Sequence, residues 1–169
     1  MRVQKKPLRA PLLGVAIVAL LGCGGDGTAN SSGPQACTEI GCGPSFEVSF
    51  SRTSWPAGVV NIVVVADGTT TNCSVTLPFA SCENLVQCDV ANTAFLVETS
   101  GCALPAAEHA VSGLLWSTNG PKQVTVTVSQ DGTMLGSKSF QPTYTTSEPN
   151  GAGCPPVCTQ STSPSSMQF

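Results

Sequence analysis

The stretch GVVNIVVVADGTTTNCSVTLP, residues 58–78, decides the fold, because it has the pattern of a β-hairpin. Its first half is rich in β-branched valine and isoleucine, which pack well on a pleated sheet. A buried helical segment is the alternative, but the run lacks helical spacing and ends at the turn signal Asp67-Gly68. Beyond that turn, Cys73, Val75 and Leu77 alternate with polar residues, as in a strand with one buried face.

Comparable patterns recur along the chain. Apolar and polar residues alternate over 46–51 and 123–129, and Asp131-Gly132 turns the second of these runs into another hairpin. Shorter runs predict further strands near 93–99, 111–116 and 143–146. We therefore expect an all-β, antiparallel β-sandwich of about seven strands over residues 37–158, followed by a disordered tail at 159–169.

The spacing of these strands resembles that of the immunoglobulin-like and fibronectin type III class of sandwiches. The resemblance covers residues 45–146. It departs from antibody domains because no tryptophan lies between two cysteines at the expected spacing. It therefore concerns architecture and carries no specific function.

The start of the chain, MRVQKKPLRAPLLGVAIVALLGC, has the order of an export signal. Basic residues precede an apolar run over 12–21, which is shorter than the roughly 20 residues of a membrane-spanning helix. The run ends in Leu20-Leu21-Gly22-Cys23, which resembles the lipobox of bacterial lipoprotein precursors. We expect residues 1–22 to form a helical signal peptide that is removed.

The lipobox resemblance implies that Cys23 becomes the lipidated amino terminus, moored to a membrane by several acyl chains. The following residue is Gly24 and not Asp, which by the same resemblance favours the outer membrane or the cell surface over the inner membrane. Residues 23–36 are small and polar, so they are expected to form a flexible tether between lipid and domain.

The cysteine count also indicates export. Nine cysteines leave eight once Cys23 is set aside, and eight can form four disulfides, which belong to oxidising compartments. We expect a terminal group that staples the first and last strands at one end, and a second group that pins a long loop; the pairing within each group is open. The terminal group is Cys37, Cys42, Cys154 and Cys158, and the second is Cys73, Cys82, Cys88 and Cys102.

A metal site is the alternative for the terminal cysteines, since tetrahedral zinc takes four thiolates. Export favours their oxidation to disulfides instead. The sequence also has no calcium-binding loop and no phosphate-binding glycine loop, so no metal and no cofactor are predicted.

Charge excludes one class of partner. Removal of the signal leaves three cations against ten carboxylates, a net charge of −7. Such a surface repels phosphate backbones, so nucleic-acid binding is not expected. The partners predicted are the membrane, through the lipid, and an unidentified protein.

The long loop at 79–92 is the preferred interaction surface, because loops held on rigid scaffolds often carry function. Its acidic residues Glu83 and Asp89 are candidate contacts. Trp55 and Trp116 are candidate platforms for a sugar or a partner, although a chain with 5% aromatic residues is expected to need both in its core.

No catalytic constellation is evident, so the sequence predicts a non-enzymatic structural or binding module. His109 is the only histidine, has no nucleophile motif around it, and is expected at the surface or in a turn. One alternative is an envelope hydrolase that uses Glu83, Asp89, Glu98 or His109, which requires a pocket where two of them converge. Another is a secreted inhibitor that presents a disulfide-pinned loop to a protease.

Overall fold

The computed structural model describes residues 36–91 and 93–169, which form one compact unit from Ala36 to Phe169. The predicted signal peptide, the lipidation site Cys23 and the tether up to residue 35 lie outside the described residues. The described residues contain a single-turn helix, η1, and eleven strands. The bounds are β1 Phe46–Ser51, β2 Gly58–Ala66, β3 Thr69–Leu77, β4 Val86–Cys88, β5 Leu96–Ser100, η1 Ala106–Glu108, β6 Ala110–Trp116, β7 Val124–Gln130, β8 Thr133–Phe140, β9 Tyr144–Ser147, β10 Cys158–Ser161 and β11 Ser165–Gln168.

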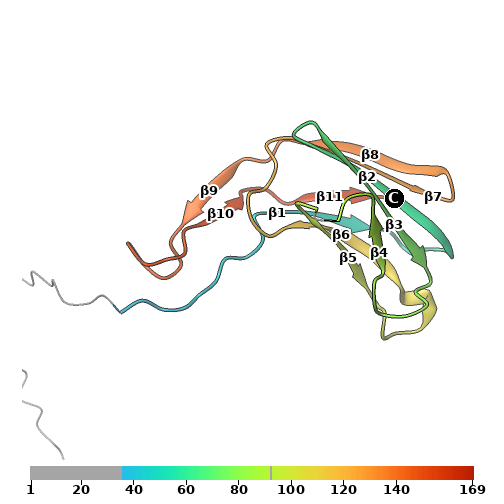
Figure 1. The fold of residues 1–169 in the computed structure, drawn as a ribbon, viewed down its shortest axis with the longest axis horizontal. Helices are drawn as coiled ribbons and strands as arrows, with labels where there is room; N and C mark the ends of the chain where they lie inside the picture. The colour runs from blue at the N-terminus through green and yellow to red at the C-terminus, as the bar shows by residue number, and fades with distance from the viewer. Residues whose placement is uncertain (1–35, 92) are drawn as a thin grey trace, which may run out of the picture. The chain divides into compact units, whose positions relative to one another are not determined.

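The strands form two facing sheets and a separate hairpin (Figure 1). One sheet has four strands in the order β11-β1-β6-β5, and the other has five in the order β4-β3-β2-β7-β8. All pairs are antiparallel except β1 with β11. The prediction of an all-β sandwich is confirmed, and the strand number exceeds seven because short strands form inside the long loop and after residue 143.

The hairpin at 58–78 forms as predicted. β2 and β3 pair along their whole length, from Gly58 opposite Leu77 to Ala66 opposite Thr69. At the turn, Asp67 and Gly68 have φ angles of 48° and 86°, and positive φ at both central residues is what a type I′ hairpin turn requires. Asp131-Gly132 makes the same kind of turn between β7 and β8, with φ angles of 47° and 80°.

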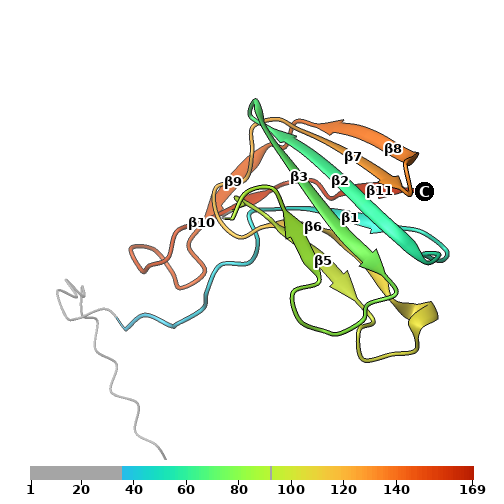
Figure 2. The ribbon, with the colours of Figure 1, turned by 45° about the vertical axis from the view of Figure 1, so that its right-hand side comes forward.

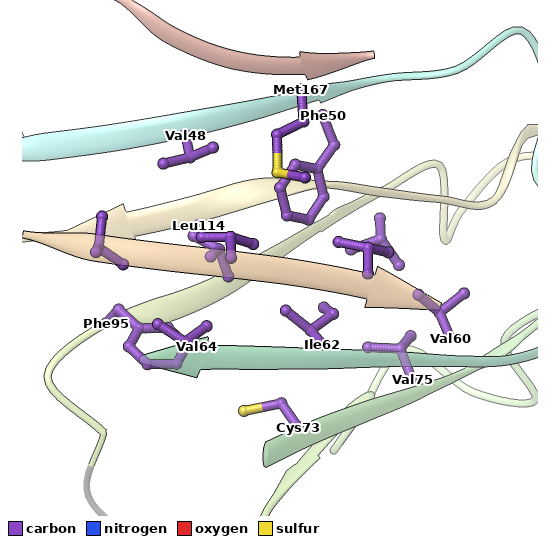
Figure 3. Close-up of a cluster of buried hydrophobic side chains, with 14 of the residues drawn as sticks. Val48, Phe50, Val60, Ile62, Val64, Cys73, Val75, Phe95, Leu114 and Met167 are labelled. Carbon is purple, nitrogen blue, oxygen red and sulfur yellow. The ribbon is translucent and has the colours of Figure 1, made fainter. Parts of the chain in front are cut away.

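The core lies between the two sheets, and the inward-facing residues of β1, β2, β3, β6 and β7 supply most of it (Figure 3). β2 and β7 contribute three buried β-branched residues each, and β6 contributes the largest buried side chain, Trp116. The fully buried residues are Phe46, Val48, Val60, Ile62, Val64, Val75, Val111, Leu114, Trp116, Val124, Val126 and Val128. Their burial is the main driving force for folding.

Residues 159–169 belong to the domain, so the prediction that they form a disordered tail is wrong. β10 pairs with β9, and β11 pairs in parallel with β1, residues 48–51 facing residues 165–168. Met167 is buried beside Phe50, and the ring of Phe169 packs against Phe50 and Trp55, with centroids 5.6 and 5.9 Å apart. The tail is too rich in serine and threonine to show an apolar period, and its partner strand is more than 100 residues away.

β8 and β11 lie next to each other and close one side of the sandwich. The Lys138 ammonium donates a hydrogen bond of 2.8 Å to the Ser166 carbonyl, and Gly136 lies against the ring of Phe169. On the other side, β4 and β5 are the outer strands of their sheets, and neither pairs with a further strand of the described chain. This side is called the open side below.

All eight cysteines that the sequence assigns to disulfides are paired, within the two predicted groups. The terminal group forms Cys37–Cys154 and Cys42–Cys158, and the second forms Cys73–Cys88 and Cys82–Cys102. The zinc alternative is therefore wrong, because no free thiolate remains in the terminal group. Four disulfides are characteristic of an oxidising compartment, so the domain is that of an exported protein.

The two terminal disulfides join residues 37–42 to the β9–β10 hairpin, which projects beyond the end of the two sheets (Figure 1; Figure 2). Asn150 holds the same two segments together. Its side-chain oxygen accepts from the Thr38 hydroxyl and the Ile40 amide, and its nitrogen donates to the carbonyls of Ile40 and Pro155. We call residues 37–42 and 148–158 the cysteine clip.

Candidate functional site

The predicted interaction loop, residues 79–91 with β4 inside it, is held at two points. Cys73 and Cys88 face each other across β3 and β4, with Cα atoms 4.0 Å apart. Cys82 is bonded to Cys102, which follows β5 in the other sheet, with Cα atoms 5.7 Å apart. The loop is therefore tied to both sheets and lies along the open side.

Asp89 is exposed, but its carboxylate holds the loop in place. Its carboxylate accepts hydrogen bonds from the Asn72 side-chain amide at 2.6 Å and from the Asn72 backbone amide at 3.0 Å. The side-chain bond first, and then the backbone bond, lowers the pKa of Asp89 below its ordinary value. Asp89 thus fixes the end of β4 to β3.

His109 is buried, with 7% of its surface exposed, so the expectation of a surface or turn histidine is wrong about its burial. Its Nδ1 accepts a 2.9 Å hydrogen bond from the Phe79 backbone amide, and its ring stacks on that of Phe79 at 4.7 Å. The geometry therefore places the proton on Nε2, which lies 3.0 Å from the Leu104 carbonyl. Nδ1 thus holds the start of the loop, while Nε2 binds the segment that precedes η1.

None of the five pockets found among the described residues is lined by two groups of the hydrolase alternative. Glu83 is exposed and lines a shallow cleft with Ser74 and Gln87. Glu98 lies on β5, where partial burial and, to a lesser extent, the nearby charge of Glu47 raise its pKa. Asp89 and His109 each bind other partners, as described above. In the part of the chain that the structure describes, no three His, Cys, Asp or Glu side chains are grouped to hold a metal ion.

Both candidate tryptophans lie in the core, so neither can present a ring face to a sugar. Trp116 is 1% exposed and packs between Phe46 and Phe95, with ring centroids 5.3 and 5.1 Å away. Trp55 is 8% exposed and contacts Phe169, and the guanidinium carbon of Arg52 lies 5.1 Å from its ring centroid. The core role that the low aromatic content predicts is confirmed for both.

The open side carries a groove that the sequence did not reveal. It runs between the unpaired edges of β4 and β5, has a volume of about 510 Å³, and is lined by apolar side chains of both sheets. Leu96 and Val90 are 61% and 43% exposed there, and Val86 and Val97 are half-buried beside them. We call this the open-side groove, and it is the candidate functional site.

The groove lies where it does because β4 and β5 are the outermost strands of their sheets on this side. A single sequence does not show the order of strands in a sheet, so the groove could not be predicted from it. The one local signal is the pair Leu96-Val97, because neighbouring residues of a strand point to opposite faces and two adjacent apolar residues leave one of them on the outer face. An exposed strand edge beside apolar side chains is a surface that can accept another polypeptide.

No helix among residues 36–91 and 93–169 is long and apolar enough to cross a membrane. Comparisons with protein-family models, curated proteins and solved structures find no match for this chain. The resemblances to lipoprotein precursors and to the immunoglobulin-like class therefore stay predictions from the sequence.

Proposed function

We propose that this chain is a lipoprotein of a bacterial envelope, anchored through Cys23 to the outer membrane or the cell surface, and that its sandwich acts as a non-catalytic binding module. The open-side groove is the observation that carries the binding role. It combines two unpaired strand edges with the exposed side chains of Leu96 and Val90. The lipobox-like sequence at Cys23 and the disulfides of an exported domain support the anchor.

The rest of the surface suits display on a membrane. The chain without its signal is strongly acidic, which disfavours collapse onto anionic lipid and nucleic acid. The predicted tether ends just ahead of the cysteine clip, so the lipid and the open-side groove are on separate parts of the chain. Several acyl chains on one residue supply the membrane affinity, and the domain contributes recognition.

The anchor is tested by feeding cells a radiolabelled fatty acid and fractionating the envelope. Label is expected in the native protein and not in Cys23→Ala, which should also leave the membrane fraction. Cys23 is the cysteine to substitute, because the other eight cysteines form disulfides and have no thiol left to carry a fatty acid. An unlabelled native protein, or a Cys23→Ala variant that stays membrane-bound, contradicts the anchor.

The binding role is tested by placing a photo-crosslinking amino acid at Leu96 in the open-side groove. The matched control carries it at Met134, which is also highly exposed but lies next to the Asp131-Gly132 turn on the closed side. We expect a discrete crosslinked envelope protein from position 96 and not from position 134. Equal products from both positions, or none from position 96, contradict a binding role for this groove.

A further inference from the structure

A second pocket lies at one end of the sandwich, where the turn after β2, the segment before β5 and the turn after β6 meet. Its volume is about 310 Å³, at the lower end of the range for small-ligand sites. Phe95 and Trp116 form its aromatic part, Val90 its apolar rim, and Asp67, Thr71 and Pro121 complete the lining. We call it the end pocket.

Trp116 offers the end pocket an unused hydrogen-bond donor. Trp116 is only 1% exposed, yet its indole Nε1–H donates no hydrogen bond to any described residue. Buried nitrogen and oxygen atoms without a partner are absent from the side chains that the structure describes. The nitrogen must therefore reach accessible space, and the end pocket is the cavity that Trp116 lines.

Thr71 gives the same pocket a second unused polar group. It occupies an inward-facing position on β3, in line with Cys73 and Val75, and is 7% exposed. Its hydroxyl has no hydrogen-bond partner among the described residues, and by the same reasoning it reaches accessible space. Polar groups in nearly buried residues usually have a hydrogen-bond partner, so these two stand out in the pocket even though each keeps some contact with solvent.

We propose that the end pocket binds a compact, uncharged group that has an apolar body and a hydrogen-bond acceptor such as an amide or ketone carbonyl. The acceptor pairs with the Trp116 Nε1–H, which can only donate, and the Thr71 hydroxyl adds a second bond of either direction. The apolar body packs on Phe95 and Val90. A ligand of this kind would bond at once to both pocket groups that have no hydrogen-bond partner among the described residues.

Charge excludes the two ionised alternatives. Among the described residues no lysine or arginine lines the pocket, and the Asp67 carboxylate at its rim disfavours an anion. Asp67 is itself engaged, since its oxygens accept from the backbone amides of Lys122 and Gln123 at 3.2 and 2.9 Å. A cation is disfavoured because the indole Nε1–H of Trp116, which can only donate, would bring a positive hydrogen toward it.

This inference goes beyond the proposed function, because it holds whether or not the chain is lipid-anchored and whether or not the open-side groove binds a protein. The end pocket shares Val90, Thr93 and Phe95 with that groove, so the two surfaces are continuous. The experiments are nevertheless separable. The crosslinking test reports on Leu96, which does not line the end pocket, and the test below reports on Trp116.

The test uses the ¹⁵N-labelled protein with its four disulfides formed, titrated with benzamide. The chain has two tryptophans, so only two indole N–H signals appear in the proton–nitrogen spectrum, and Trp55→Phe assigns them. We expect a saturable shift of the Trp116 signal and none of the Trp55 signal, since Trp55 lines a different cleft. Benzoate and benzylamine, which have similar bodies but carry a charge, should bind at least about tenfold more weakly.

Two variants separate the pocket from the fold. Thr71→Val keeps the shape of the side chain and removes the hydroxyl, and it should weaken benzamide binding by about five- to tenfold. Thr70→Val, one residue away on the opposite, exposed face of β3, should bind as the native protein does. An unmoved Trp116 signal, equal shifts of both indoles, equal affinity for a charged analogue, or native affinity in Thr71→Val overturns the proposal. A Trp116 signal that shifts with protein concentration alone would show that a second copy occupies the pocket, and this also overturns it.

Discussion

The hydroxyl of Tyr144 donates a 2.8 Å hydrogen bond to the carbonyl of Pro121, which joins the β9–β10 hairpin to the turn before β7. Burial, and then the nearby negative charge of Asp67, raise the pKa of Tyr144 to about 12. Tyr144 is the only tyrosine in the chain, so the phenolate absorbance of the whole protein reports this one group.

We predict that this absorbance titrates with a midpoint near pH 12 in the folded protein and near about pH 10 in denaturant. Because the folded pKa exceeds the unfolded one, the folded state holds its proton more tightly. The stability that this provides is fully present below about pH 10 and is lost as the pH rises through the folded pKa. Tyr144→Phe should abolish the signal, and a folded midpoint near 10 would contradict the assigned environment.

Glu98→Gln is predicted to stabilise the protein at neutral pH. The raised pKa of Glu98 means that its charged form is less favourable in the folded than in the unfolded state. The gain from the substitution should be absent below the ordinary glutamate pKa of about 4.3, grow as the pH rises through the folded pKa, and then stay constant. Urea unfolding across this pH range measures it.

The control for this prediction is Glu83→Gln, which removes one charge from the exposed loop and should not reproduce that pH profile. Glu47→Gln provides a second check. It removes the negative charge of Glu47, which contributes less than burial to the raised pKa of Glu98, and should bring that pKa part of the way back to its ordinary value. Identical profiles of stability against pH for Glu98→Gln and Glu83→Gln would contradict the prediction, because the gain would then come from the change in net charge alone.

His109→Ala is predicted to destabilise the domain by about 1–3 kcal/mol, because it leaves the buried Phe79 amide without an acceptor. The Leu104 carbonyl and the stacked Phe79 ring lose their partner as well. Glu108→Ala, at the exposed neighbouring position, is the control and should change stability little. Urea denaturation midpoints compare the two, and equal midpoints would refute the structural role of the imidazole.

The two disulfides of the cysteine clip are predicted to depend on each other. While one remains, removing the other reopens only a short loop made of residues 37–42 and 154–158, at a cost of about 3 kcal/mol in the chain-entropy account. Removing both reopens a loop of more than 100 residues and should cost about 7–8 kcal/mol. Paired Cys→Ala substitutions, measured singly and together by chemical unfolding, test this. A combined cost that merely doubles the single cost would contradict it.

The sequence predicted best the features that depend on neighbouring residues. The β-branched run of β2, the Asp67-Gly68 turn and the alternation of β7 each determine local structure, and all three are observed. The two cysteine groups are also predicted, one as a staple between the two ends of the domain and one as a clamp on the long loop, and each pairs within itself. The pairing within each group required the register of β3 with β4 and the course of the last segment.

Features that depend on distant packing were missed. β11 pairs with β1 through backbone groups, and only Met167 and Phe169 of that tail provide apolar anchors. The burial of His109 depends on the ring and amide of Phe79, thirty residues earlier. The open-side groove depends on which strands end their sheets. None of these relationships leaves a periodic signal in one sequence.

The cysteine clip determines how a pulling force on the amino-terminal end of the domain is transmitted to the strands. Tension applied to the chain ahead of Cys37 reaches a covalent branch to Cys154 before it reaches β1, and Cys42–Cys158 provides a second branch. A pull along the predicted tether is therefore shared with the β9–β10 hairpin, and the hydrogen bonds between β1 and β6 do not bear it first. Under such a load the domain should resist unzipping from its amino-terminal strand until both bonds are reduced.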